Sequence, residues 1–138
     1  SVLIYYIPLW GGLDKTDVKD LQILQNKAAQ HVLLLPPRSN RNQMFNSLNW
    51  LTVNQLIFYH TVLTVYKIRQ TKEPEYLVNK LSMDNCRGNL IVPATGLALA
   101  KKSFCFPGGD NWLSIPPSIR NIKKLDIFKS SLKKWVME

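Results

Sequence analysis

The clearest pattern of apolar and polar positions lies near the middle of the chain and predicts a helix from about Val53 to Arg69. Thr52 stands three residues before Gln55, which is the spacing of a capping box, in which each side chain bonds the backbone amide of the other residue. We expect this helix to be largely surrounded by protein, because apolar residues recur at helical spacing and neighbours thicken the apolar face: Leu56, Ile57, Tyr59, Val62, Leu63, Tyr66 and Ile68.

Two further helices are predicted before this one. The run from Val2 to Trp10 is apolar and is consistent with either a buried strand or the end of a helix. After Gly11-Gly12, Asp14, Thr16 or Asp17 can cap a helix that ends before Pro36. Capping and the helix dipole explain Asp14, Asp17 and Asp20 better than a metal site does. Its predicted apolar face is Val18, Leu21, Leu24, Gln25, Ala28 and Val32. A short helix follows, capped by Ser39 or Asn40, with Met44, Phe45 and Leu48 facing inward.

The pattern changes after a further short helix that starts at Pro74 and carries Tyr76, Leu77 and Leu81. Glycine, proline and asparagine then interrupt every helical period, and two short strand-like runs, 90–92 and 103–106, predict a small hairpin. Gly108-Gly109-Asp110 is predicted to be a turn, and Trp112 to anchor a docked segment. A turn of helix at 119–122 and a final helix opened by Asp126 complete the chain. Its predicted apolar side is Ile127, Phe128, Leu132, Trp135 and Val136.

These elements predict a mainly α fold: a helical array with a small, irregular β-hairpin in the C-terminal third and a final amphipathic helix. Residues 1–138 fit a single domain, with a helical part at 1–81 and a loop, hairpin and basic helix at 82–138. The chain opens on an apolar run without Met, which favours a fragment of a longer polyprotein.

The charge balance favours an anionic partner. Eighteen lysines and arginines stand against nine aspartates and glutamates, which gives a net charge of +9. Nucleic acid is therefore favoured over an acidic substrate, although the same charge could serve solubility alone. No run is long enough to span a membrane, and two cysteines are too few for a disulfide scaffold, so we expect an intracellular protein of the nucleus or cytoplasm.

The basic residues gather in the last third of the chain. Lys129 and Lys133 are one helical turn apart and Lys134 follows, which predicts a cationic stripe opposite the apolar face of the last helix. A solvated face of a structural helix is the alternative. The candidate nucleic-acid-binding residues are Lys101, Lys102, Arg120, Lys123, Lys124, Lys129, Lys133 and Lys134. Trp112 or Phe106 could stack on an unpaired base, although core packing is the commoner role of such residues.

No catalytic pattern is visible. The sequence has no nucleophile elbow, no phosphate-binding glycine loop and no adjacent pair of aspartates. His31 and His60 could combine with Cys86 and Cys105 in a zinc site, but their spacing does not support one, and ordinary hydrogen-bonded histidines are favoured. We therefore predict a non-enzyme without catalytic residues, metal or cofactor.

Several segments together resemble a known family. They are 5–11 (YYIPLWG), 21–29 (LQILQNKAA), 48–55 (LNWLTVNQ), 66–68 (YKI), 74–77 (PEYL), 112–120 (WLSIPPSIR) and 128–133 (FKSSLK). In this order they resemble the region that follows the polymerase core in reverse transcriptases of jockey-like non-LTR retrotransposons. Tyr6 and Leu113 depart from the family, which usually has glycine and asparagine there.

The resemblance implies a non-catalytic thumb and tail region that binds the element's RNA, or an RNA/DNA hybrid, while an upstream polymerase domain copies it. The paired aspartates that hold two metal ions in that polymerase are not in this chain. The implied partners are RNA or an RNA/DNA hybrid, contacted through phosphates, and the upstream domain, with no membrane. The alternative is a protein-interaction or structural module that dimerises or docks a partner through Tyr5, Tyr6 and Trp10.

Overall fold

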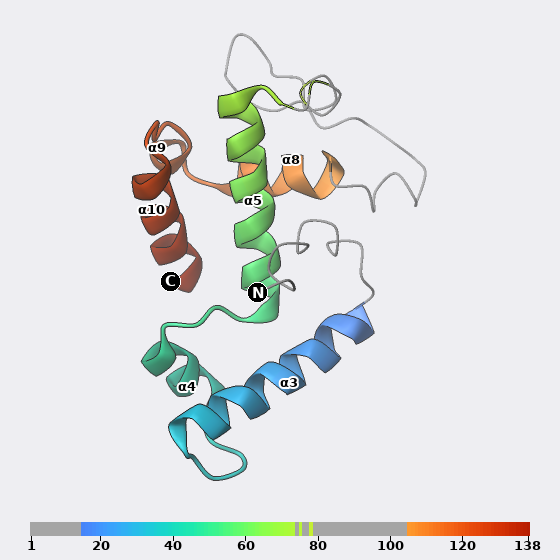
Figure 1. Ribbon diagram of the computed structural model, residues 1–138, viewed down its shortest axis with the longest axis vertical. Helices are drawn as coiled ribbons and strands as arrows, with labels where there is room; N and C mark the ends of the chain where they lie inside the picture. Colours follow the sequence, from blue (N-terminus) through green and yellow to red (C-terminus); the bar gives the residue numbers. More distant parts are fainter. Residues whose placement is uncertain (1–14, 74, 76–77, 79–104) are drawn as a thin grey trace. The chain divides into compact units, whose positions relative to one another are not determined.

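The computed structural model describes residues 15–73, 75, 78 and 105–138, and within these residues the chain is helical, with no strand (Figure 1). The prediction of a mainly α protein is therefore confirmed for this part of the chain. Described residues up to Leu56 form one compact unit, and those from Ile57 onward form another. The described residues form the helices α3 (Lys15–Leu33), α4 (Arg41–Leu48), α5 (Val53–Thr71), α8 (Cys105–Ser114), α9 (Pro117–Arg120) and α10 (Leu125–Met137).

The predicted capping box starts α5. The backbone amide of Thr52 donates to Oε1 of Gln55 at 3.0 Å, and the amide of Gln55 donates to Oγ1 of Thr52 at 3.4 Å. Two amides at the helix start, which have no partner inside the helix, are thus satisfied by side chains. The helix begins at Val53 as predicted and runs two residues beyond the predicted end, to Thr71.

Glutamine side chains of α3 hold the segment that leads into α5. Nε2 of Gln25 donates to the carbonyl oxygen of Leu51 at 2.8 Å, and the amide of Val53 donates to Oε1 of Gln22 at 3.0 Å. Nε2 of Gln22 in turn donates to Oδ1 of Asn26 at 3.0 Å. These hydrogen bonds join backbone groups on both sides of residue 52 to a helix that lies about thirty residues earlier in the chain. The start of α5 is therefore fixed by tertiary contacts as well as by its own cap.

A small apolar cluster completes this first unit. Ala29, Met44 and Phe45 are buried, and Leu33, Leu48 and Trp50 pack against them.

The side chain of Asn40 accepts a hydrogen bond from the amide of Asn42 at 3.0 Å, which confirms the predicted cap of α4 and selects Asn40 over Ser39.

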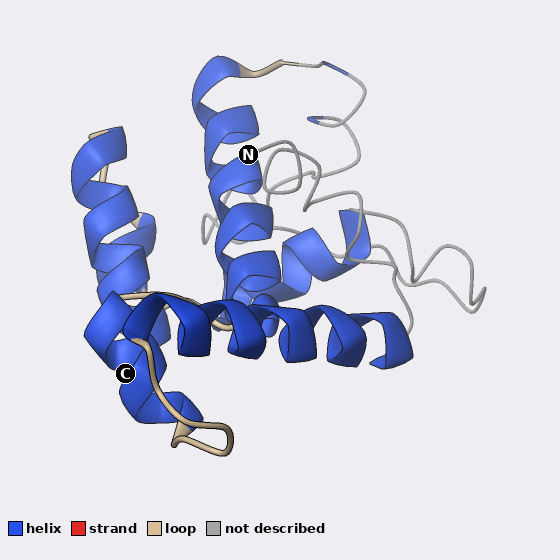
Figure 2. Ribbon diagram, turned by 60° about the horizontal axis from the view of Figure 1, so that its bottom comes forward, coloured by secondary structure: helices blue, strands red, loops and turns tan. Residues whose placement is uncertain are grey.

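The buried face of α3 differs from the predicted one. Ala29 is fully buried, whereas the predicted Leu24 and Val32 are 61% and 59% exposed. The prediction followed the most hydrophobic positions, but α3 instead directs Ala29 towards α4, where a small side chain permits close packing. Figure 2 shows α3 as one uninterrupted helix, so the predicted and the observed buried faces differ by a rotation about the helix axis.

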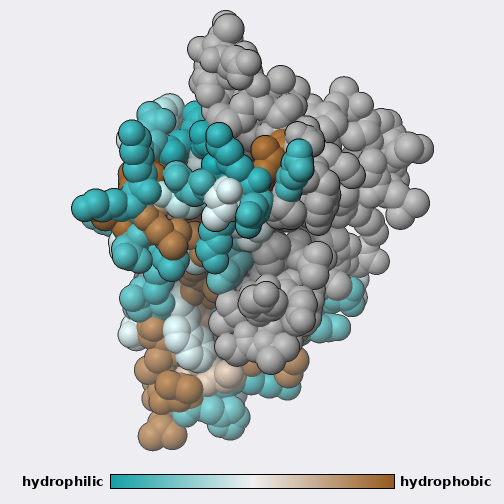
Figure 3. All heavy atoms as spheres, turned by 45° about the horizontal axis from the view of Figure 1, so that its top comes forward, coloured by the Kyte–Doolittle hydropathy of each residue, from teal (hydrophilic) through white to brown (hydrophobic). Residues whose placement is uncertain are grey.

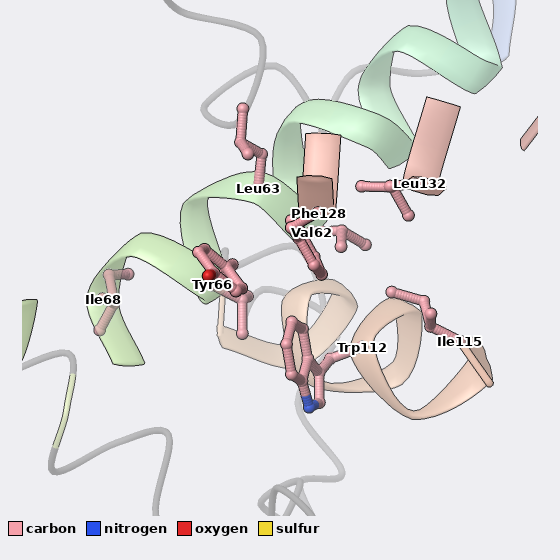
Figure 4. Packing of buried hydrophobic residues seen from close by; sticks show 9 residues of the cluster. Val62, Leu63, Tyr66, Ile68, Trp112, Ile115, Phe128 and Leu132 are labelled. Atoms are coloured by element: carbon pink, nitrogen blue, oxygen red, sulfur yellow. The ribbon is translucent and has the colours of Figure 1, made fainter. Parts of the chain in front are cut away.

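An apolar core holds the second unit together (Figure 4). The ring of Phe128 stacks on Tyr66 with centroids 4.0 Å apart and lies 6.1 Å from the ring of Trp112. Phe58 meets Trp135 at 5.9 Å, so α10 runs antiparallel to α5. The buried members of this core are Val62, Leu63, Val65, Tyr66, Ile68, Trp112, Ile115, Phe128 and Leu132.

The predicted β-hairpin is not supported. Cys105 and Phe106, assigned to its second strand, form the first turn of α8, and its first strand at 90–92 lies outside the described residues. Gly108-Gly109, expected in a turn, are buried inside the same helix. Pro107 is compatible with a helix here because the amides of the first turn have no partner within the helix. Burial of Trp112 thus outweighs the weak helix propensity of the two glycines.

Other predicted elements are met in part. Glu75 and Val78 are helical, whereas the runs 1–14 and 79–104 and the residues Pro74, Tyr76 and Leu77 lie outside the described residues. The turn of helix expected at 119–122 is found at 117–120 as α9. In α10, Phe128 and Leu132 are buried as predicted, but Ile127 is 51% exposed. No described helix combines the length and the apolarity needed to cross a membrane.

Replacement of Phe128 by alanine should lower the free energy of unfolding by about 3–5 kcal/mol, because it removes a ring buried against Tyr66 and Trp112. Ile127→Ala is the matched control on the same helix, since Ile127 is half exposed and should cost well under about 1 kcal/mol. Urea unfolding of both variants measures the difference. Equal losses would show that α10 does not pack on α5 through Phe128.

Candidate nucleic-acid interface

The lysines of α10 occupy the part of the helix that the core leaves uncovered. Phe128 and Leu132 face the core, Lys129 and Lys133 are half-buried, and Lys134 is exposed. At 3.6 residues per turn, Lys129 and Lys133 lie about 40° apart around the axis, and Lys134 lies about 100° beyond Lys133. The three ammonium groups therefore spread over a broad arc that begins beside the apolar face and ends opposite it.

The connection between α9 and α10 adds two exposed lysines, Lys123 and Lys124. The hydroxyl of Tyr66 donates to the carbonyl oxygen of Lys123 at 2.7 Å, which attaches this connection to α5. Arg120, the last residue of α9, is half-buried. Lys101 and Lys102, the remaining predicted contacts, lie outside the described residues.

Acidic residues are scarce in the sequence around these lysines. From Pro117 to Met137 the sequence has one acidic residue, Asp126, against six basic ones. Among the residues that the structure describes, none of the lysines at 123, 124, 129, 133 and 134 takes part in an ion pair. Their charges therefore remain available to an anion from solution.

Trp112 cannot stack on a base, contrary to the predicted possibility. Its side chain is fully buried, with the ring of Phe128 at 6.1 Å. The guanidinium carbon of Arg69 stands 4.6 Å from the ring centroid of Trp112, a cation–π contact. Neighbours thus pack closely around the indole, and its role is in the core. The side chain of Phe106 lies outside what the structure describes.

No sequence pattern singled out Arg69, whose guanidinium the structure places over the ring of Trp112. Burial, together with the nearby positive charge of Arg120, lowers the pKa of Arg69 below its usual value. Arg69 and Arg120 are 51 positions apart, and Arg69 belongs to none of the segments singled out in the sequence. The packing of α8 against α5 brings Trp112 to Arg69, so no local pattern could have found this contact.

The histidines do not form the zinc site that was considered. His31 is exposed in the first unit, and His60 is half-buried in the second. In the described part of the chain no three histidine, cysteine, aspartate or glutamate side chains group closely enough to hold a metal ion. Cys86 lies outside the described residues.

Comparisons of the chain with protein-family models, with curated proteins and with solved structures find no match. The similarity to retrotransposon reverse transcriptases therefore depends on the sequence segments alone. Apolar and hydrophilic atoms both reach the surface that Figure 3 shows, so hydropathy does not mark one face as the interface. The distribution of charge is the more informative property.

Burial of His60 should make the second unit less stable in acid. Desolvation and the charge of Lys67 lower the pKa of His60, so the unfolded chain binds a proton more readily than the folded one. Stability should be constant above about pH 7.5 and fall as the pH decreases through 6.5 towards the lower folded pKa. His60→Gln should reduce this fall, as measured by urea unfolding at several pH values.

His31→Gln is the control for that measurement, because His31 is exposed and lies in the other unit. An unchanged acid dependence in His60→Gln would show that His60 is not the group responsible.

Proposed function

We propose that this chain is a non-catalytic nucleic-acid-binding domain that holds RNA, or an RNA/DNA hybrid, through phosphate contacts. The observation that carries the proposal is the set of un-neutralised lysines on α10 and on the connection before it, at 123, 124, 129, 133 and 134. The resemblance to the C-terminal region of a non-LTR retrotransposon reverse transcriptase supports the same function. In that setting the chain would hold the template while an upstream polymerase domain copies it.

Lysine suits contact with phosphate that does not depend on base sequence. Its ammonium group is a point charge on a flexible stem, so it can follow a backbone whose phosphates shift in position. Each neutralised phosphate releases condensed counterions, and this gain accounts for most non-specific affinity. A rigid helix bound to the core by Phe128 and Leu132 keeps these charges together without a further ordering cost for the backbone.

Charge reversal at Lys129, Lys133 and Lys134 should abolish retention of a single-stranded RNA of about 20 nucleotides in a filter or mobility assay. The matched control reverses Lys15, Lys19 and Lys27, which are exposed on α3 and change the net charge by the same amount. Binding should persist in the control. Equal loss in both variants would indicate attraction by net charge alone, and retention in both would exclude the α10 lysines.

The salt dependence provides a second measurement on milder variants. Neutralising the three lysines to glutamine should reduce the slope of log K against log salt by about 2, because each lost phosphate contact on a single strand contributes about 0.7. Affinity is compared between about 50 mM and 200 mM salt. An unchanged slope would mean that these side chains do not contact phosphate.

A second candidate function is a protein-interaction module. The predicted aromatic surface at Tyr5, Tyr6 and Trp10 lies outside the described residues, but Leu34 gives this candidate an observation of its own. Leu34 is 92% exposed and has a φ of 51° at the end of α3, where glycine would fit without strain. The left-handed backbone closes the end of α3, because the amide of Leu35 donates to the carbonyl oxygen of Gln30 at 3.0 Å and the amide of Leu34 to that of His31 at 3.3 Å. The exposed side chain is not needed for this cap, since glycine usually occupies such a position.

If the chain is an interaction module, it should be a stable dimer in light scattering that does not bind RNA. Leu34→Gly should then weaken the dimer while stabilising the folded subunit by up to about 1 kcal/mol, because glycine adopts the left-handed conformation without strain. Ser47→Gly is a control for a general effect of glycine, since Ser47 is exposed on α4. A monomer that binds RNA contradicts this candidate.

A further inference from the structure

The connection between α3 and α4 carries an apolar tip, formed by residues 34–37, in the first unit. Figure 1 shows this connection as a loop that extends beyond the ends of the two helices that it joins. Leu34 is 92% exposed and Leu35 is 42% exposed, and Pro36 and Pro37 after them are exposed as well. A contiguous apolar patch on the surface of a folded unit marks an interaction site, whereas single exposed apolar residues do not.

Hydrogen bonds within the connection hold the tip in one shape. The amide of Leu35 donates to the carbonyl oxygen of Gln30 at 3.0 Å, and the hydroxyl of Ser39 donates to the carbonyl oxygen of Pro36 at 2.7 Å. The two prolines restrict the backbone between these bonds, because each pyrrolidine ring fixes φ. The tip is therefore ordered before a partner binds, which lowers the entropy cost of binding.

The backbone of Leu34 does not require a side chain of this size. Its φ of 51° lies in the left-handed region, where glycine usually closes a helix. A leucine there is unfavourable for folding, because its Cβ crowds a neighbouring carbonyl oxygen, and the exposed side chain adds nothing to the core. Contact with a partner therefore explains a leucine at this position better than folding does.

Two arginines follow the tip, and no carboxylate lies near them in the sequence. Arg38 on the connection and Arg41 at the start of α4 are both exposed. From Leu21 to Lys72 the sequence has no aspartate or glutamate. Asp20, the last acidic residue before the tip, lies about 20 Å along α3 from the end of the helix. This separation exceeds the Debye length of about 8 Å at physiological salt, so Asp20 does not offset the arginines.

We propose that Leu34 is an apolar wedge that enters between two base pairs of an RNA/DNA hybrid, while Arg38 and Arg41 bind phosphates beside the opened step. This assignment rests on the proposed function, which supplies the class of partner. Proteins that open a base step insert an apolar side chain, leucine among them, and contact the nucleic acid around it with arginine or lysine. The minor groove of an A-form duplex is wide and shallow, so a side chain at a loop tip can reach the base edges.

Two other partners fit the tip less well. A second copy of the chain that met this tip symmetrically would bring the two arginines of each copy together, and like charges repel. A lipid surface needs more apolar area than the tip supplies, since even one fatty acyl chain gives only marginal membrane binding. A duplex needs one inserted side chain and cations beside it, and the tip provides both.

The test uses the whole chain and a short RNA/DNA hybrid that carries a fluorescent adenine analogue, whose emission rises when the base unstacks. The unaltered chain should raise the emission. Leu34→Gly should lose most of that rise and still fold, because glycine adopts the left-handed conformation without strain. Leu34→Met should keep most of the rise, since methionine also serves as a wedge. Leu24→Ala, which shortens another exposed leucine of α3, should keep it fully.

The arginines are tested on the same hybrid through the salt dependence of binding. Replacement of both Arg38 and Arg41 by glutamine should reduce the slope of log K against log salt by about 2, because each phosphate contact on a duplex contributes about 0.9. The matched control replaces Lys15 and Lys19, which are exposed at the start of α3, and should leave the slope unchanged.

A chain that binds the hybrid without raising the emission, or a Leu34→Gly variant that keeps the full rise, would overturn the wedge and leave the proposed function standing. A chain that binds neither single-stranded RNA nor the hybrid would overturn both. Loss of the rise in Leu34→Gly, with RNA binding unchanged by reversal of the α10 lysines, would support the wedge and remove those lysines from the proposed function. Dimerisation, or binding to phosphatidylserine vesicles, that Leu34→Gly abolishes without any rise on the hybrid would overturn the wedge and assign the tip to that partner.

Discussion

The stack of Tyr66, Phe128 and Trp112 is the interaction on which the second unit depends. Each ring comes from a different helix, and Phe128 lies between the other two. Aromatic pairs contribute specific geometry as well as buried area, so this contact fixes how α5, α8 and α10 pack together. The Tyr66 hydroxyl extends the same arrangement to the connection before α10 through Lys123. The placement of the candidate site residues follows from these few contacts.

What the sequence could predict was local. The capping box at Thr52 and Gln55 was recognisable because its two residues are three positions apart and bond each other's amides. The helices around it, including the cap of α4 at Asn40, follow from the same kind of short-range signal. Four buried residues of α5 were also foreseen from the apolar stripe at helical spacing, namely Val62, Leu63, Tyr66 and Ile68. The buried Thr61 and Val65 were not among the predicted residues.

What the sequence could not predict depends on contacts distant in the chain. α8 was mistaken for a strand and a turn because glycine and proline normally break helices, and burial of Trp112 outweighs that preference only once α5 and α10 are in place. The rotation of α3 towards Ala29 depends on α4 and on the glutamine contacts at Leu51 and Val53. The pattern of hydrophobic residues alone could not predict the helix α8 or the rotation of α3.

The residues of the candidate site also differ in whether local sequence spacing could predict them. The lysines of α10 were found by spacing, since the apolar positions of an amphipathic helix determine which residues remain for solvent. The contact of Arg69 with Trp112 depends on packing alone, and Arg69 was not among the predicted contacts. The two kinds of side chain also differ physically: lysines on flexible stems can follow a polyanion, whereas the Arg69 guanidinium is held over an indole ring.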